Sequence, residues 1–139
     1  MMFDVNVRAP FFLTAALVPK MIARGSGVVV NVSTAAPASL ADAPVYAATK
    51  AALESLTRSW AAAFGGNGIR VNTVAPGPTR TDAAIDTLGD GVEQMGSQTA
   101  LGRTADPTEI AEAIVFLASP RASYLTGATV PVDGGYSAI

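Results

Sequence analysis

The spacing of apolar residues along the chain predicts alternating helices and strands. Residues from about 5 to 23 carry apolar side chains at helical spacing, and the glycine-containing turn at residues 24–27 ends that helix. Residues 28–32 form a β-branched run, interrupted by Asn31, that does not alternate with polar residues. Such a run is typical of a strand that helices bury on both faces, as in a parallel sheet.

The same alternation continues toward the C-terminus. A second helix is expected at about residues 44–64 and a second strand at residues 69–74, with the chain leaving the sheet at residues 75–78 because proline cannot donate to the ladder. Residues 79–103 show little periodicity and predict a loop with one or two short helices. Asp106 and Glu109 then form a capping box that opens a third helix, and residues 127–132 supply a last strand.

This order predicts an α/β fold in which right-handed crossovers build a parallel sheet. We treat residues 1–139 as a single unit of such a fold. No Gly-x-Gly-x-x-Gly or Gly-x-x-x-Gly-x-Gly pattern follows any predicted strand. A glycine-rich loop that cradles a pyrophosphate at a helix N-terminus is therefore not expected within these residues.

Composition excludes several classes of function. The chain has 50% hydrophobic and 14% charged residues, which is enough apolar material for a core. Its nine basic and eleven acidic residues are scattered, so no basic face for nucleic acid is expected. The absence of cysteine and histidine excludes thiolate and imidazole nucleophiles and the usual zinc sites. Proton transfer must therefore use tyrosine, lysine or carboxylates, and no metal site is expected.

The N-terminal residues do not resemble a secretory signal, because Asp4 and Asn6 interrupt them before any apolar core. The longest apolar stretch, residues 9–18, is shorter than a membrane span. We therefore expect a cytoplasmic protein without membrane contact.

Tyr46 and Lys50 are four residues apart and would lie on one face of the second predicted helix. A cation beside a phenol favours the phenolate, which lets the phenol pass a proton near neutral pH. The spacing alone arises often by chance. Two hydroxyl residues, Ser33 and Thr34, follow the first predicted strand, at the sheet edge where open α/β folds bind their ligands.

Together with Asn6, the Pro76–Gly77 turn and residues 133–135, these features resemble the C-terminal half of the short-chain dehydrogenase/reductase family. The resemblance runs from about residue 4 to residue 136 and is strongest to the compact subfamily that includes 3-oxoacyl-[acyl-carrier-protein] reductases. It implies the C-terminal part of a Rossmann-like, doubly wound parallel sheet, the catalytic and substrate-binding half. The N-terminal glycine-rich βαβ units of the family, which bind most of the cofactor, would be absent.

The resemblance also implies roles for individual residues. Tyr46 would be the general acid in carbonyl reduction and the base in alcohol oxidation, and Lys50 would lower its pKa and bind the nicotinamide ribose. Asn6 would hold a proton-relay water, although alone it could equally be an ordinary polar residue at a helix start. The residues expected to contact the cofactor are Tyr46, Lys50, Pro76, Gly77, Thr79 and Thr81.

The hydroxyl that orients the substrate has two candidates. Counting back from Tyr46 selects Ser33, whereas counting forward from Asn31 selects Thr34. We prefer Ser33 and keep Thr34 as the alternative. Both could also be ordinary strand-end residues that bond local backbone groups.

The resemblance predicts an NAD- or NADP-dependent oxidoreductase that acts on a small-molecule carbonyl or alcohol. It also implies a homodimer or homotetramer that pairs through the helices carrying Asn6 and Tyr46. Two alternatives remain: a catalytically inert remnant that acts as a helix-mediated association module, and a sugar-nucleotide epimerase or dehydratase. The last shares the Tyr-x-x-x-Lys pattern but fits the Asp-Gly-Gly sequence at residues 133–135 poorly.

Overall fold

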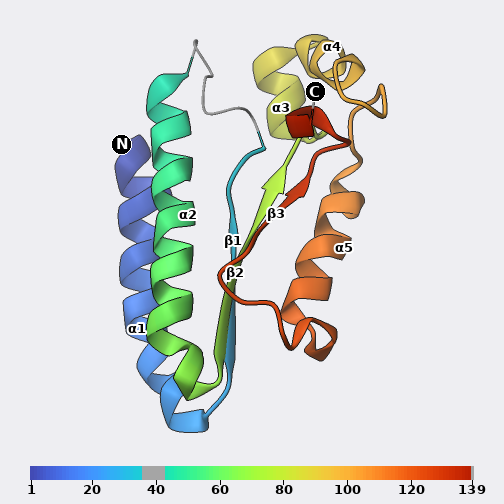
Figure 1. Ribbon diagram of the computed structural model, residues 1–139. Helices are drawn as coiled ribbons and strands as arrows, with labels where there is room; N and C mark the ends of the chain where they lie inside the picture. Colours follow the sequence, from blue (N-terminus) through green and yellow to red (C-terminus); the bar gives the residue numbers. More distant parts are fainter. Residues whose placement is uncertain (36–42, 139) are drawn as a thin grey trace.

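A three-stranded parallel sheet forms the centre of the protein, with helices on both faces (Figure 1). The computed structural model describes residues 1–35 and 43–138. Strands β1 (Gly27–Val32), β2 (Ile69–Pro76) and β3 (Thr129–Val132) lie in the order β1-β2-β3. Helix α2 (Pro44–Phe64) connects β1 to β2 on one face, and α5 (Pro107–Ala118) precedes β3 on the other. This architecture confirms the predicted α/β class.

The N-terminal helix lies beside α2 on the same face of the sheet. It begins with a π-helical turn, η1 (Asp4–Arg8), and continues as α1 (Ala9–Arg24). Gly25 ends it at φ 71°, a left-handed conformation that costs glycine little, as the turn at residues 24–27 predicted. The core on this face is built from Val18, Trp60, Ala61, Ile69 and Val71.

The helix from Asp4 to Arg24 has 21 residues and, among the described residues, is long and apolar enough to cross a membrane by length and composition. The continuous helix is thus longer than the apolar stretch at residues 9–18, which we expected to be too short to span a membrane. One such helix is weak evidence of a membrane protein, because the core helix of a soluble protein and a signal sequence near the N-terminus pass the same test. Here the helix packs on the rest of the fold: the Phe11 and Trp60 ring centroids lie 6.3 Å apart.

The opposite face of the sheet has its own core, formed with α5. The predicted capping box is present, because the Asp106 side chain accepts from Thr108 N and Glu109 accepts from Asp106 N. These bonds satisfy donors that the first turn of a helix leaves free. The buried members of this core are Val74, Ile110, Leu117 and Ala122.

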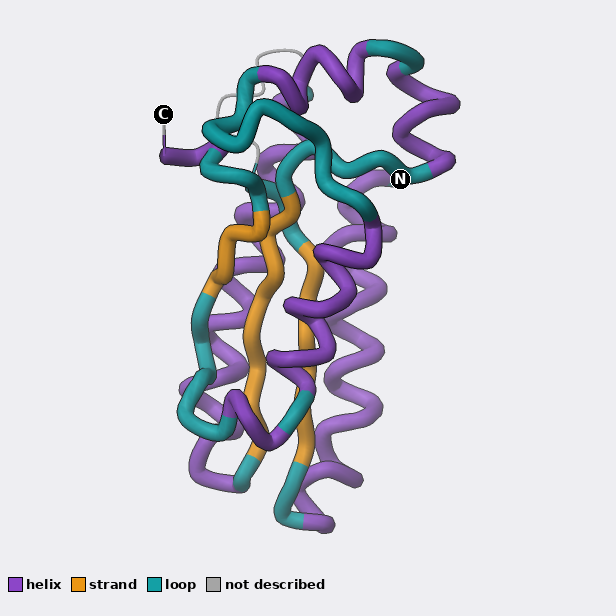
Figure 2. The backbone as a smooth tube through the Cα atoms, turned by 90° about the vertical axis from the view of Figure 1, so that its right-hand side faces the viewer, coloured by secondary structure: helices purple, strands orange, loops and turns teal. Residues whose placement is uncertain are grey.

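The segment expected to be a loop with short helices contains two of them, α3 (Asp82–Leu88) and α4 (Gly91–Ser97). Figure 2 shows helices above the carboxyl ends of the strands, where the segment between β2 and α5 runs. The end of β2 differs from the prediction, because the strand continues through Pro76. Proline has no N–H to donate to the ladder, but its carbonyl accepts from Ala35 N at 2.8 Å and the following Gly77 N donates to Val132 O at 3.0 Å. The sheet therefore keeps its hydrogen bonds on both sides of Pro76.

A buried polar contact explains why Asn31 interrupts the β-branched run of β1. Its amide donates to Thr57 Oγ1 of α2 at 2.8 Å, and Thr57 Oγ1 also lies 2.8 Å from Thr73 Oγ1 of β2. The Thr57 and Thr73 side chains are fully buried. These hydrogen bonds fix how α2 sits on the sheet, because a shift of either element would leave a buried polar group without its partner.

Replacing Thr57 with valine keeps the shape of the side chain but removes the oxygen to which Asn31 donates. We expect the free energy of unfolding to fall by about 1–3 kcal/mol, because a buried amide loses its partner. Urea denaturation monitored by circular dichroism measures the change. Ser59→Ala, at an exposed position on the same helix, is the control and should have little effect. Equal stability of Thr57→Val and the unaltered protein would show that the Asn31 contact contributes nothing.

Candidate active site

Tyr46 and Lys50 lie in the first two turns of α2, beside the end of β1. Pro44 occupies the first helical position, where its missing N–H costs nothing, so the tyrosine is held close to the helix N-terminus. Lys50 Nζ donates to Val32 O at 3.0 Å and lies 5.5 Å from the centroid of the Tyr46 ring. The phenol and the ammonium therefore share one face of the helix, as their spacing predicted.

The two candidate hydroxyls point to different partners. Ser33 is buried and its Oγ donates to Glu54 Oε1 of α2 at 2.7 Å. Thr34 is hydrogen-bonded through its side chain to Tyr46. Side chains alternate between the faces of a strand, and Asn31 and Ser33 both point toward α2. The structure thus places Thr34, the alternative in the sequence analysis, beside the phenol.

Burial controls the ionisation of both groups. It raises the pKa of the Tyr46 phenol above its ordinary value, and the hydrogen bond with Thr34 opposes part of that change. Burial also lowers the pKa of the Lys50 ammonium. We expected the ammonium to lower the pKa of the phenol. Here the pKa of the phenol is raised instead, because burial removes the water that would stabilise the phenolate.

Asn6 is connected to the turn of α2 that carries Tyr46 through an intermediate residue that the sequence analysis did not identify. Its Nδ2 donates to Thr49 Oγ1 at 3.1 Å, and Thr49 Oγ1 donates to Tyr46 O at 2.7 Å. Asn6 lies within the π-helical turn, a local distortion that is frequent at functional sites. It also lines a hollow of about 610 Å³ together with Lys50. The position of Thr49, three residues after Tyr46, was the signal available in the sequence.

The Pro76–Gly77 turn lies at the end of β2, and both of its residues line the same cleft as Tyr46 and Lys50. A Cβ at Gly77 would lie 2.6 Å from Asp133 Cα, so only glycine allows this close approach. Thr79 Oγ1 donates to Gly77 O at 2.9 Å, and Thr81 Oγ1 accepts from Ala84 N at 3.1 Å at the start of α3. The turn therefore has a packing reason of its own, independent of any ligand.

A cleft of about 560 Å³ joins these elements. It brings together both candidate hydroxyls, the phenol and ammonium, and every residue expected to contact a cofactor, whereas Asn6 lies in the neighbouring hollow. Helices α3 and α4 cover one side of it. The predicted residues that line it are Ser33, Thr34, Tyr46, Lys50, Pro76, Gly77, Thr79 and Thr81.

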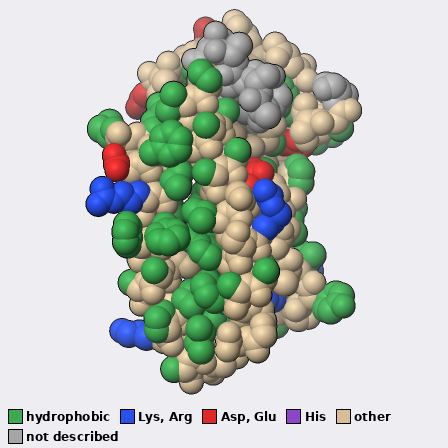
Figure 3. All heavy atoms as spheres, turned by 60° about the vertical axis from the view of Figure 1, so that its left-hand side comes forward, with side chains coloured by type: hydrophobic (Ala, Val, Ile, Leu, Met, Phe, Trp, Pro, Cys, Tyr) green, Lys and Arg blue, Asp and Glu red, His purple; other side chains and the backbone are tan. Residues whose placement is uncertain are grey.

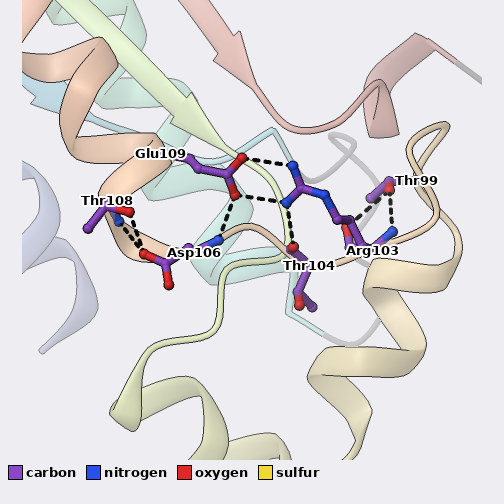
Figure 4. A network of polar contacts seen from close by, with 6 residues as sticks. All are labelled: Thr99, Arg103, Thr104, Asp106, Thr108 and Glu109. Carbon is purple, nitrogen blue, oxygen red and sulfur yellow. Dashed lines mark hydrogen bonds and ion pairs between the residues drawn. The ribbon is translucent and has the colours of Figure 1, made fainter.

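A network of ion pairs links the covering helices to α5. Arg80 Nε donates to Glu93 Oε1 of α4 at 2.7 Å, and Thr104 Oγ1 donates to Glu93 Oε2 at 3.1 Å. Arg103 then forms two hydrogen bonds of 2.8 Å with Glu109 (Figure 4). These bonds of Arg103, together with that of Asp106 N, lower the pKa of Glu109 from 4.5 to about 2. Among the described residues, no group of acidic side chains could hold a metal ion.

This geometry matches known proteins. The family model described as Enoyl-(Acyl carrier protein) reductase matches residues 1–137. The chain belongs to the short-chain dehydrogenase/reductase family. A galactitol 2-dehydrogenase (L-tagatose-forming) from Cereibacter sphaeroides is 40% identical over 139 residues, covering 96% of this chain and 54% of the relative. A cis-4-hydroxycyclohexanecarboxylate dehydrogenase from Sinomonas cyclohexanicum is 46% identical over 120 residues, covering 86% of this chain and 48% of the relative.

Solved structures of family members are similar to this chain over nearly its whole length. A short chain dehydrogenase/reductase family protein is 54% identical with a TM-score of 0.87, over 99% of this chain and 57% of that one. A gluconate 5-dehydrogenase from Burkholderia cenocepacia J2315, in complex with NADP and tartrate, is 33% identical with a TM-score of 0.87, over 99% of this chain and 55% of that one. The chain thus spans about half the length of the curated relatives it matches.

The depressed pKa of Glu109 gives a prediction for acid stability. The carboxylate stabilises the fold fully above its ordinary pKa of 4.5, and this contribution is lost as the pH falls from there toward 2. Urea midpoints measured from pH 7 to pH 2.5 should therefore show Glu109→Gln less stable than the unaltered protein at neutral pH, with the difference shrinking below about pH 4.5. A difference that grew on acidification would contradict the ion pair.

Proposed function

We propose that this chain forms the proton-transfer and substrate-binding half of an NAD(P)-dependent oxidoreductase that interconverts a small-molecule carbonyl and its alcohol. The observation that carries the proposal is the Thr34–Tyr46 hydrogen bond beside Lys50, in a cleft that also contains the Pro76–Gly77 turn. A phenol, a second hydroxyl and a cation at one point are the groups that carbonyl reduction needs.

The residues at one end of the cleft fit the nicotinamide half of a cofactor. Lys50 supplies a cation for ribose hydroxyls, and the turn from Pro76 to Thr81 supplies backbone groups and hydroxyls. The bound nicotinamide would supply or accept a hydride. A glycine-rich loop, which would bind the pyrophosphate of such a cofactor, does not occur in this sequence.

In the reducing direction, the carbonyl oxygen of the substrate accepts hydrogen bonds from Tyr46 Oη and Thr34 Oγ1. As charge develops on that oxygen, the phenol proton moves to it and completes the alcohol. Thr34 then donates to the phenolate that remains, and the charge of Lys50 stabilises it. In the oxidising direction, the phenolate takes the proton of the alcohol. Ser33 Oγ is engaged with Glu54, so Thr34 is the hydroxyl that acts beside the phenol.

The assignment can be tested in a chimera that joins the chain to the N-terminal half of a 54% identical family member. We expect Tyr46→Phe to lower kcat for carbonyl reduction by about 10²–10⁴-fold, because the proton donor is lost. The matched pair Thr34→Val and Ser33→Ala distinguishes the two hydroxyls, and Thr34→Val should cause the larger loss. A larger loss in Ser33→Ala would return the role to Ser33, and full turnover in Tyr46→Phe would refute the mechanism.

For the 139-residue chain alone we expect no measurable binding of NADH or NADPH by titration calorimetry. The reason is that the phosphate-binding loop, which contributes much of the affinity in dinucleotide-binding folds, does not occur in this sequence. The chimera serves as the control and should bind. Micromolar binding by the chain alone would show that the cleft suffices to bind the cofactor. The preference of the chimera for NADH or NADPH would depend on the added N-terminal half.

We further propose that the protein pairs as a homodimer or homotetramer through η1, α1 and α2. Hydrophobic side chains gather on the face shown in Figure 3. Phe11 and Phe12 of α1 are 44% and 60% exposed, and together with Leu56 of α2 they line a shallow hollow of about 540 Å³. An exposed apolar surface of this kind is typical of a protein interface. The same surface would also serve the alternative, an association module without catalysis.

A further inference from the structure

Apolar side chains form much of the lining of the cleft. Helices α3 and α4 contribute four of them, and α5 contributes four more. Among the described residues that line this cleft, Lys50 is the one that carries a charge, and its ammonium already donates to Val32 O. The apolar residues that matter here are Ala84, Leu88, Val92, Met95, Ile110 and Ile114.

Four charged residues that lie outside the cleft pair with one another. Arg80, Glu93, Arg103 and Glu109 line a separate hollow of about 240 Å³, where they form the ion pairs described above. Val92, next to Glu93 in the sequence, faces the cleft and is only 4% exposed. Helix α4 thus turns its apolar face to the cleft and its acid to Arg80.

Close packing keeps α4 in this position. A Cβ at Gly96 would come within 2.4 Å of Thr104 N, so the helix lies directly against the segment that leads to α5. The Glu93 carboxylate accepts from both Arg80 and Thr104 and so fixes α4 from two sides. The apolar surface is therefore part of the folded structure and does not depend on a ligand to form it.

A carboxylate or a polyol placed against these side chains would lose its hydration without gaining hydrogen bonds, whereas a hydrocarbon frame would gain from leaving water. We infer that the substrate of this site is an uncharged, predominantly apolar ketone or secondary alcohol. Its oxygen meets Tyr46 and Thr34, and its carbon frame packs against Leu88, Val92 and Met95. This inference rests on the proposed function and adds to it a class of substrate.

The test compares three probes that differ in charge and polarity: methyl 4-oxocyclohexanecarboxylate, the 4-oxocyclohexanecarboxylate anion, and mannitol. Each is titrated into the methyl-labelled 139-residue chain without nicotinamide, and the chemical shifts of the Leu88, Val92 and Met95 methyl groups are followed by NMR. The neutral ester should shift these methyls and saturate, and the anion should bind at least about tenfold more weakly, with mannitol weaker still.

Two matched variants locate the effect. Leu88→Lys places an ammonium on the cleft side of α3 and should reduce or reverse the preference for the ester over the anion. Ile85→Lys alters a similarly exposed residue of the same helix that does not line the cleft, and should leave the preference unchanged. Equal or tighter binding of the anion or mannitol to the unaltered chain would overturn the inference, as would failure of the ester to shift these methyls.

Because the readout is equilibrium binding, it separates the substrate class from the reaction. If the ester binds at these methyls but the chimera never reduces it, the proposed reaction fails and the ligand class stands. If the chimera reduces the anion more efficiently than the ester, measured as kcat/KM, the ligand class fails and the proposed reaction stands.

Discussion

Polar contacts between α2 and the end of β1 are the constraint on which the site depends. Along the helix, Lys50 bonds the carbonyl of Val32, Glu54 bonds Ser33, and Thr57 bonds Asn31. Each contact is specific in direction, unlike the apolar packing beneath it, so together they set both the position and the rotation of α2 on the sheet. The location of the phenol at the top of that helix follows from them, since Tyr46 lies one turn before Lys50.

The pattern of apolar residues was sufficient to predict the order of elements, the parallel sheet and the end of α1 at a glycine turn, because these follow from local sequence. It did not predict that β2 continues through Pro76, since that depends on Ala35 and Val132, which lie far away in the sequence. The preference for Ser33 over Thr34 rested on counting residues. Counting could not reveal that Ser33 Oγ bonds Glu54 of α2 while Thr34 bonds Tyr46, because both contacts join segments that are separated in the sequence.

The electrostatics could be predicted only in part. The spacing of Tyr46 and Lys50 correctly indicated that they share a face, but the pKa of the phenol is raised, because burial is the largest influence on it. Burial is a property of the assembled fold and has no local signature in sequence. The network from Arg80 to Glu109 was also hidden, because its members come from four segments, of which only the capping box was visible.

The attachment of α4 has a consequence for how this family of sites could diversify. Arg80 and Thr104 hold the helix by its outer face, while its inner face touches the cleft. Residues at the inner positions can therefore change without disturbing either the anchor or the proposed acid–base groups on α2. If the proposed function holds, the residues that contact the substrate and those that transfer the proton lie on different elements, so the range of substrates can change through mutation while the reaction stays the same.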